Sequence, residues 1–167
     1  MRSIILLCLF AFLAINDATA QKFGYVDSQA IIEKMPEVKE ANSNIETFRT
    51  QLQKRGQEMF QALQNKVQEL QRRESQGEIS PKALDVEMQK LKTEENQILQ
   101  FEQESQQKIF EKSESLLSPI RDRIQTAIDE VAAENGYTYI FDFSTGFVLY
   151  ADSSTNVNTL VMAKLGM

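Results

Sequence analysis

The side chains that could perform chemistry are few in this sequence, and the missing ones exclude most enzyme classes. The chain of 167 residues has no His and one Cys. His is the usual general base near neutral pH, and Cys supplies the thiolate nucleophile. Neither a P-loop nor a dinucleotide-binding glycine pattern occurs. The sequence therefore predicts no catalytic residue, no metal site and no cofactor, and we expect a protein that is not an enzyme.

Paired carboxylates remain the one route to acid–base chemistry. Asp27, Glu33 and Asp142 lie near the predicted strands, and two carboxylates with separated pKa values can act as acid and base. The competing interpretation makes them strand-end and turn residues that face solvent, and we favour it. An envelope enzyme that uses carboxylates is thus our third hypothesis.

The first twenty residues have the pattern of a secretory signal peptide. Arg2 supplies the positive start, residues 4–15 the apolar stretch, and Ala-Thr-Ala at 18–20 the small-residue cleavage site. The apolar stretch is too short to span a bilayer. Cys8 lies inside this stretch, which argues against a lipid-anchored Cys. We therefore predict export, with cleavage after Ala20.

The charge that remains after cleavage excludes one class of partner. Removing Arg2 and Asp17 leaves 18 − 1 = 17 basic and 24 − 1 = 23 acidic residues, still a net charge of −6. The basic footprint of a nucleic-acid-binding protein is absent, so no nucleic-acid partner is expected. No Cys remains, so the mature chain needs no disulfide in an oxidising compartment.

Two long helices are predicted for most of the mature chain. Pro36 suits the first helical position, and apolar residues then recur at steps of three and four, with an irregularity at Gly56. Ser80-Pro81 starts a second helix, which Asn135-Gly136 ends. These helices should form an antiparallel hairpin.

The hairpin is expected to divide the chain into an arm and a body. We assign residues 36–117 to a coiled-coil arm, and we assign residues 21–35 and 118–167 to a β-rich oligomerisation body. Pro119 should bend the second helix at the joint between them.

The body is predicted to contain strands and short helices. KFGYVD at 22–27 alternates like a strand, and Ser28 can cap a short helix at 29–35. A terminal helix is expected around 157–165. Two runs rich in aromatic and β-branched residues are joined by a turn with Gly, which predicts a β-hairpin; these runs are 137–143 and 147–151, and the turn is Ser144-Thr145-Gly146.

The predicted β-hairpin is apolar on both faces. Ile140 lies on one face, and alternation places four aromatic residues on the other, namely Tyr137, Tyr139, Phe141 and Phe143. Three short strands of one chain cannot bury both faces, so we expect self-association that removes open edges. The predicted oligomerisation residues are Phe23, Tyr25, Ile140, Phe141, Val148 and Leu149. The alternative is a monomer whose terminal helix covers the sheet.

The mature chain resembles the Skp/OmpH family of periplasmic chaperones. The segments that carry the resemblance are GYVDSQAIIEKMPE, LLSPIRDRIQTAIDEVAAENGYTYIFD and NVNTLVMAKLG, in this order around the helical hairpin. The resemblance implies an α+β fold, in which a long helical hairpin projects from a small β body and three chains build an intersubunit β-barrel. It also implies an ATP-independent periplasmic holdase that binds unfolded outer-membrane proteins in a cavity between the arms.

Four arm residues are predicted to contact clients. Phe48 and Phe101 fall in the apolar stripes, where seam packing is the favoured interpretation. The two doublets Met59-Phe60 and Ile109-Phe110 are too wide for a single seam. We therefore expect one member of each doublet to face outward, and we predict client binding by Met59, Phe60, Ile109 and Phe110.

A structural or adaptor coiled coil with one fixed envelope partner is the rival hypothesis. Relatives in the family have a basic surface, whereas this mature chain carries −6. The arm tip offers three cations beside two carboxylates, namely Arg72, Arg73, Lys82, Glu74 and Glu78. The sequence thus gives little support for contact with a membrane surface.

Overall fold

The computed structural model describes residues 21–167, so the predicted signal peptide and its cleavage site lie outside the described residues. The chain divides into two compact units, one formed by the residues up to Gln29 with Thr126–Met167, and the other by Ala30–Gln125. The elements in order are β1 (Phe23–Val26), α2 (Ser28–Lys34), α3 (Pro36–Ser75), α4 (Pro81–Asn135), β2 (Tyr139–Asp142), two short 3₁₀ helices (Phe143–Thr145 and Ser153–Thr155) and α5 (Asn158–Lys164).

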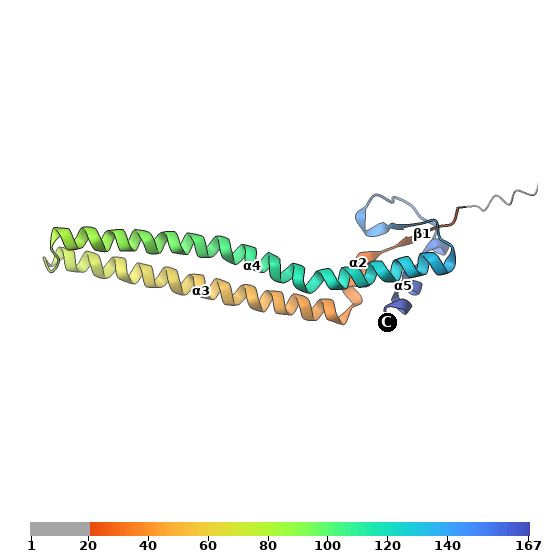
Figure 1. Ribbon diagram of the computed structural model, residues 1–167, viewed down its shortest axis with the longest axis horizontal. Helices are drawn as coiled ribbons and strands as arrows, with labels where there is room; N and C mark the ends of the chain where they lie inside the picture. The colour runs from red at the N-terminus through yellow and green to blue at the C-terminus, as the bar shows by residue number, and fades with distance from the viewer. Residues whose placement is uncertain (1–20) are drawn as a thin grey trace, which may run out of the picture. The chain divides into compact units, whose positions relative to one another are not determined.

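The two long helices form the predicted antiparallel hairpin. Figure 1 shows α3 and α4 side by side along the length of α3. Two ion pairs fix the register: Glu37 with Arg123 at 2.9 Å, and Lys66 with Glu94 at 2.6 Å. Residue numbers rise along α3 as they fall along α4, which confirms the helical hairpin.

Local signals set the ends of these helices. Pro36 is the first residue of α3 and follows an extended Met35, so the missing proline N–H costs nothing there. The backbone N–H of Ala83 donates to the Ser80 hydroxyl oxygen at 3.3 Å, which confirms the N-cap of α4. Gly136 follows α4 with φ of 69°, the left-handed conformation that Gly adopts without a steric penalty. α4 continues through Pro119, and the bend there stays a prediction.

The seam between the helices is thin. Few apolar side chains in it are buried, namely Val38, Ala41, Ile45 and Leu70 on α3 and Ile98, Ile120 and Ile124 on α4. The Phe101 ring lies 3.6 Å from the point where a Cβ on Gly56 would stand. The predicted irregularity at Gly56 is therefore covered by an aromatic ring, and Phe101, like Phe48, is half-buried.

The sheet differs from the prediction. β1 and β2 pair in parallel, with Phe23 opposite Tyr139 and Val26 opposite Asp142. The predicted strands 22–27 and 137–143 thus exist in shortened form, as β1 and β2. However, β2 pairs with β1 and not with residues 147–151, which follow β2 in the chain. The predicted β-hairpin is wrong.

The turn of that hairpin forms, but its second strand does not. Phe143–Thr145 is a 3₁₀ helix, and the N–H of Gly146 donates to the Phe143 carbonyl oxygen at 3.4 Å. Residues 147–152 have no regular secondary structure. A strand needs a hydrogen-bonding edge, and a two-stranded hairpin is only marginally stable in water. Phe147, Leu149 and Tyr150 remain exposed.

Tyr137 also departs from the prediction. Its N–H donates to the Ala132 carbonyl oxygen at 3.0 Å, so it belongs to the end of α4 and lies outside the alternation of β2. A Cβ on Gly24 would lie 3.0 Å from the Tyr137 ring and 3.2 Å from Val157. Tyr137 therefore packs on the face of the sheet opposite Tyr139, and only Gly at position 24 leaves room for it.

The predicted terminal helix is confirmed as α5, which packs within the unit that contains the sheet. α5 buries Val161, and Val26, Val131 and Val157 are buried in the same unit. Lys164 on α5 contacts Glu134 at 2.6 Å and Glu130 at 3.5 Å. The hydrogen bond to Glu134 and the charges of both carboxylates raise the pKa of Lys164.

Candidate functional site

The candidate carboxylate Asp142 is a structural acceptor at the end of β2. It accepts hydrogen bonds from the Ser28 hydroxyl at 2.5 Å and from the Ser144 N–H and hydroxyl at 3.0 and 2.8 Å. Burial raises the pKa of Asp142, but the hydrogen bonds from Ser28 and Ser144 outweigh burial and leave this pKa below its usual range. Ser28 is the first residue of α2. Its hydrogen bond to Asp142 therefore links the start of α2 to the end of β2.

The lowered pKa predicts a pH-dependent loss of stability. Asp142→Asn should reduce the free energy of unfolding at pH 7 by about 1 kcal/mol, because the partly exposed donors of Ser28 and Ser144 lose a charged acceptor. The difference in the free energy of unfolding between the wild type and Asp142→Asn should be fully present above the ordinary carboxyl pKa of about 4. It should vanish as the pH falls through the lower folded-state value. Urea unfolding of both proteins at pH 7 and pH 3 measures the difference.

Asp152→Asn is the matched control for this carboxylate. Hydrogen bonds from the backbone N–H and hydroxyl of Ser154 lower the pKa of Asp152 as well. This carboxylate is exposed and caps only the short helix that follows it. We expect a smaller effect than at Asp142, and equal effects of the two variants would contradict the proposed tie between β2 and α2.

The other two candidate carboxylates do not join Asp142 in an acid–base site. The backbone N–H of Asp27 donates to the Asn158 side-chain oxygen at 2.8 Å, which links the end of β1 to the start of α5. Glu33 is exposed on α2. Within residues 21–167 no group of acidic, Cys or His side chains is arranged to hold a metal ion.

The two arm doublets each present their aromatic member to solvent. Phe60 is 54% exposed and Phe110 is 60% exposed. Met59 and Ile109, their neighbours, are half-buried. The prediction that one member of each doublet faces outward is confirmed, and in both cases that member is Phe.

Phe60 and Ile109 both line one groove, which we call the middle groove. It has a volume of about 960 Å³ and lies between α3 and α4. The apolar residues that line it are Leu52, Gly56, Phe60, Phe101 and Ile109, and the polar ones are Arg49, Gln53, Gln57, Glu102, Gln103, Ser105 and Gln106. Met59 and Phe110 do not line this groove. One member of each doublet thus lines this groove.

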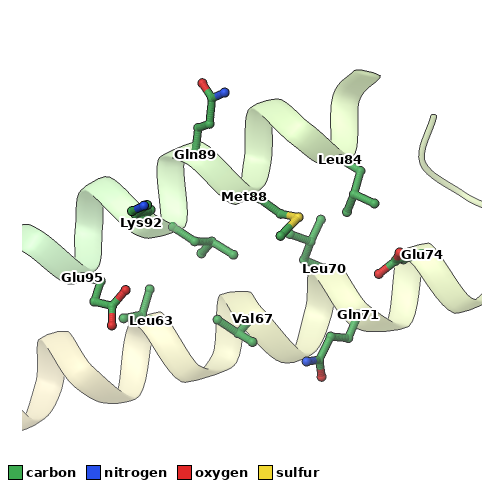
Figure 2. Close-up of a pocket in the computed structure, with 11 residues that line it drawn as sticks. Leu63, Val67, Leu70, Gln71, Glu74, Leu84, Met88, Gln89, Lys92 and Glu95 are labelled. Atoms are coloured by element: carbon green, nitrogen blue, oxygen red, sulfur yellow. The ribbon is translucent and has the colours of Figure 1, made fainter. Parts of the chain in front are cut away.

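A second groove, the distal groove, lies nearer the turn between the helices and holds about 570 Å³. Figure 2 shows Leu63, Val67 and Leu70 of α3 facing Leu84 and Met88 of α4. Gln71 and Gln89 point away from this apolar centre (Figure 2). The hairpin therefore carries two grooves in series along its seam, a distal one with an apolar centre and a middle one of mixed polarity.

A buried hydroxyl in the middle groove predicts a stabilising substitution. Ser105 is buried, and its hydroxyl has no hydrogen-bond partner in the part of the chain that the structure describes. Ser105→Ala removes this unpaired group and improves helix propensity. The free energy of unfolding should rise by about 1 kcal/mol, measured by urea unfolding followed by circular dichroism.

Ser115→Ala is the matched control on the same helix. The Ser115 hydroxyl is exposed and donates to the Lys112 carbonyl oxygen at 2.9 Å. This variant gains propensity without releasing a buried polar group. If both variants stabilise α4 equally, the Ser105 hydroxyl has a partner in the assembled protein.

Aromatic rings form an exposed surface on one face of the sheet, which we call the aromatic surface. The Phe23 ring stacks on Tyr139 at 5.9 Å and on Phe141 at 6.3 Å between centroids. All three rings are exposed. Tyr25 is half-buried and packs on Phe143 at 5.4 Å. A hydrophobic area of this kind marks an interaction site on a soluble protein.

The predicted oligomerisation residues fall on two sides of the sheet. A groove of about 450 Å³ is lined by five of them, namely Phe23, Tyr25, Phe141, Val148 and Leu149, together with Gly24, Phe147, Tyr150, Ala151 and Thr155. Leu149 is 92% exposed. Ile140 pairs with Gly24 and is half-buried on the other face. The structure therefore separates Ile140 from the rest.

Sequence reasoning missed Leu99, which is exposed on α4. It adjoins Ile98, which is buried. Met88 is exposed and also lines the distal groove. The signal that could have identified Leu99 is the spacing of 11 positions from Met88 to Leu99 and from Leu99 to Phe110.

These features define an α+β protein in which a helical hairpin carries two grooves along its seam and a small sheet carries an exposed aromatic surface. No helix in residues 21–167 has the length and apolar character to cross a membrane. The chain belongs to the OmpH-like outer membrane protein family, whose model matches residues 22–165.

A solved structure has the same fold. The chain resembles the crystal structure of an OmpH-like protein from Caulobacter crescentus CB15, with a TM-score of 0.73 and 18% sequence identity over 87% of this chain and 83% of that chain. Comparison with curated proteins gave no match.

Proposed function

We propose that the chain is a periplasmic, ATP-independent holdase chaperone that binds unfolded outer-membrane proteins. Membership of the OmpH-like family and the likeness to an OmpH-like protein described as an outer membrane chaperone support this role. The observation that carries the proposal is the exposure of Phe60 and Phe110 on a mostly polar hairpin surface, where the other exposed large apolar side chains are Val86, Met88 and Leu99. A holdase needs apolar contacts spaced widely enough that the free protein does not aggregate.

We propose further that three chains assemble through the sheet unit, in an intersubunit β-barrel from which the arms, residues 36–117, project around a cavity. The aromatic surface and the exposed residues Phe147 and Leu149 support self-association, because a stable monomer rarely leaves such an area in water. The alternative of a covering terminal helix accounts for one face only, since Val157 packs at Gly24 while Phe23 and Tyr139 stay exposed. The number three comes from the family resemblance.

An aggregation assay tests the function. Several unrelated β-barrel membrane proteins are diluted from urea into buffer without ATP, alone or with the mature protein at stoichiometric ratios. A holdase should suppress light scattering for all of them. An adaptor with one fixed partner should leave every client to aggregate, and that outcome would replace the holdase by the adaptor hypothesis.

A further inference from the structure

α4 carries a row of exposed apolar side chains beside the seam. Met88, Leu99 and Phe110 are exposed and stand 11 positions apart. Eleven residues make just over three turns, so the three side chains leave the helix in nearly one direction, about 16 Å apart along its axis. Val86, also exposed, points roughly 140° away from this row.

Both grooves open on the side of this row. The middle groove is lined by Gln103 and Gln106 of α4, and the distal groove by Met88 and Lys92. At 100° per residue, all four positions lie within about 40° of the row. Phe60 of α3 lines the middle groove from the opposite helix. We call this side of the hairpin the grooved flank.

The other side of the hairpin is charged, and we call it the ion-paired flank. A depression of about 500 Å³ there is lined by six charged residues among nine, namely Lys66, Glu69, Arg73, Glu87, Lys90 and Glu94. Lys66 pairs with Glu94 at 2.6 Å and Lys90 with Glu87 at 2.8 Å. The middle groove has only two charged residues among twelve, Arg49 and Glu102.

We propose that the arm binds extended, apolar segments of unfolded clients through the grooved flank only. This inference rests on the proposed holdase function. An apolar segment laid on the ion-paired flank would remove water from paired charges without replacing their hydration, which is unfavourable. On the grooved flank the same segment meets Phe60, Leu99 and Phe110, while the amides of Gln103 and Gln106 can hydrogen-bond its backbone.

Site-specific crosslinking tests the sidedness, because the mature chain has no Cys. One apolar and one polar position on each flank are changed to Cys and labelled with benzophenone maleimide. The grooved flank takes Leu99→Cys and Gln106→Cys, and the ion-paired flank takes Val86→Cys and Lys90→Cys. With an unfolded β-barrel protein bound, we expect at least fivefold more crosslinked client from the grooved flank.

A second measurement does not depend on the label. Leu99→Ser should weaken client binding at least threefold, whereas Val86→Ser should leave it unchanged, although Leu99 and Val86 are similarly exposed at 54% and 46%. Equal crosslinking from the two flanks, or equal losses from the two Ser variants, would overturn the inference while client holding stands. If the unmodified protein holds no client, the proposed function and this inference fail together.

Discussion

Leu149→Asp is expected to convert the assembled protein into a folded monomer. Leu149 is 92% exposed in the single chain, so the substitution removes no contact within it. In the proposed trimer the same side chain is buried between subunits, where an unpaired carboxylate costs roughly 3–5 kcal/mol. Threefold symmetry would place three such charges in one interface. Light scattering should show the mass of one chain, while circular dichroism should show unchanged helix content.

Two further variants make this result interpretable. Leu99→Asp adds the same charge at an exposed Leu of the helical hairpin and should leave the assembled mass unchanged. Ile140→Asp also should abolish assembly, but Ile140 is half-buried and paired with Gly24, so this variant also endangers the sheet itself. A monomeric mass for the unmodified protein would end the assembly proposal.

Phe60→Ser combined with Phe110→Ser is expected to weaken client binding about tenfold or more, since a loss of 1.4 kcal/mol is tenfold in affinity. Each half-exposed ring offers apolar area to a client, and each ring recurs on every arm of the assembly. Several weak contacts at high effective concentration hold a mobile client without fixing its conformation. Assembled mass and helix content should stay nearly unchanged, because neither ring is buried. Client affinity is measured by fluorescence titration.

Salt distinguishes this apolar contact from attraction by charge. Screening weakens exposed charge–charge interactions between low and moderate ionic strength, whereas apolar contact persists. The matched control is Phe48→Ser, whose half-buried ring lines neither the middle nor the distal groove and should affect helix stability more than binding. Client binding that survives the Phe60 and Phe110 substitutions but collapses with added salt would assign client choice to the acidic surface.

The helices could be predicted because their signals are local. Pro36, Ser80-Pro81 and Gly136 each act on the backbone within a turn of themselves, and the structure places helix ends at all three. The outward position of one member of each doublet followed from helical geometry as well, since adjacent residues cannot both enter a narrow seam; that the exposed member is Phe60 and Phe110 comes from the structure.

The sheet could not be predicted in the same way. Residues 139–142 have strand composition, but composition does not choose a partner, and β1 supplies the edge from the far end of the chain. Tyr137 was misplaced because alternation was extended across a residue that still belongs to the end of α4. Leu99 was missed because a row with a period of 11 is sparse beside the dense three-and-four stripe of the seam.

The pairing of β1 with β2 sets an order of folding. Phe23 lies opposite Tyr139, and 139 − 23 = 116 positions of the chain separate them. Closing so large a loop from an unfolded chain is slow and entropically unfavourable. Once the hairpin forms, the contact of Glu37 with Arg123 brings its two ends together and leaves only short connections to each strand. We therefore expect the first strand to emerge early in synthesis and to wait, unpaired, until the last quarter of the chain is available.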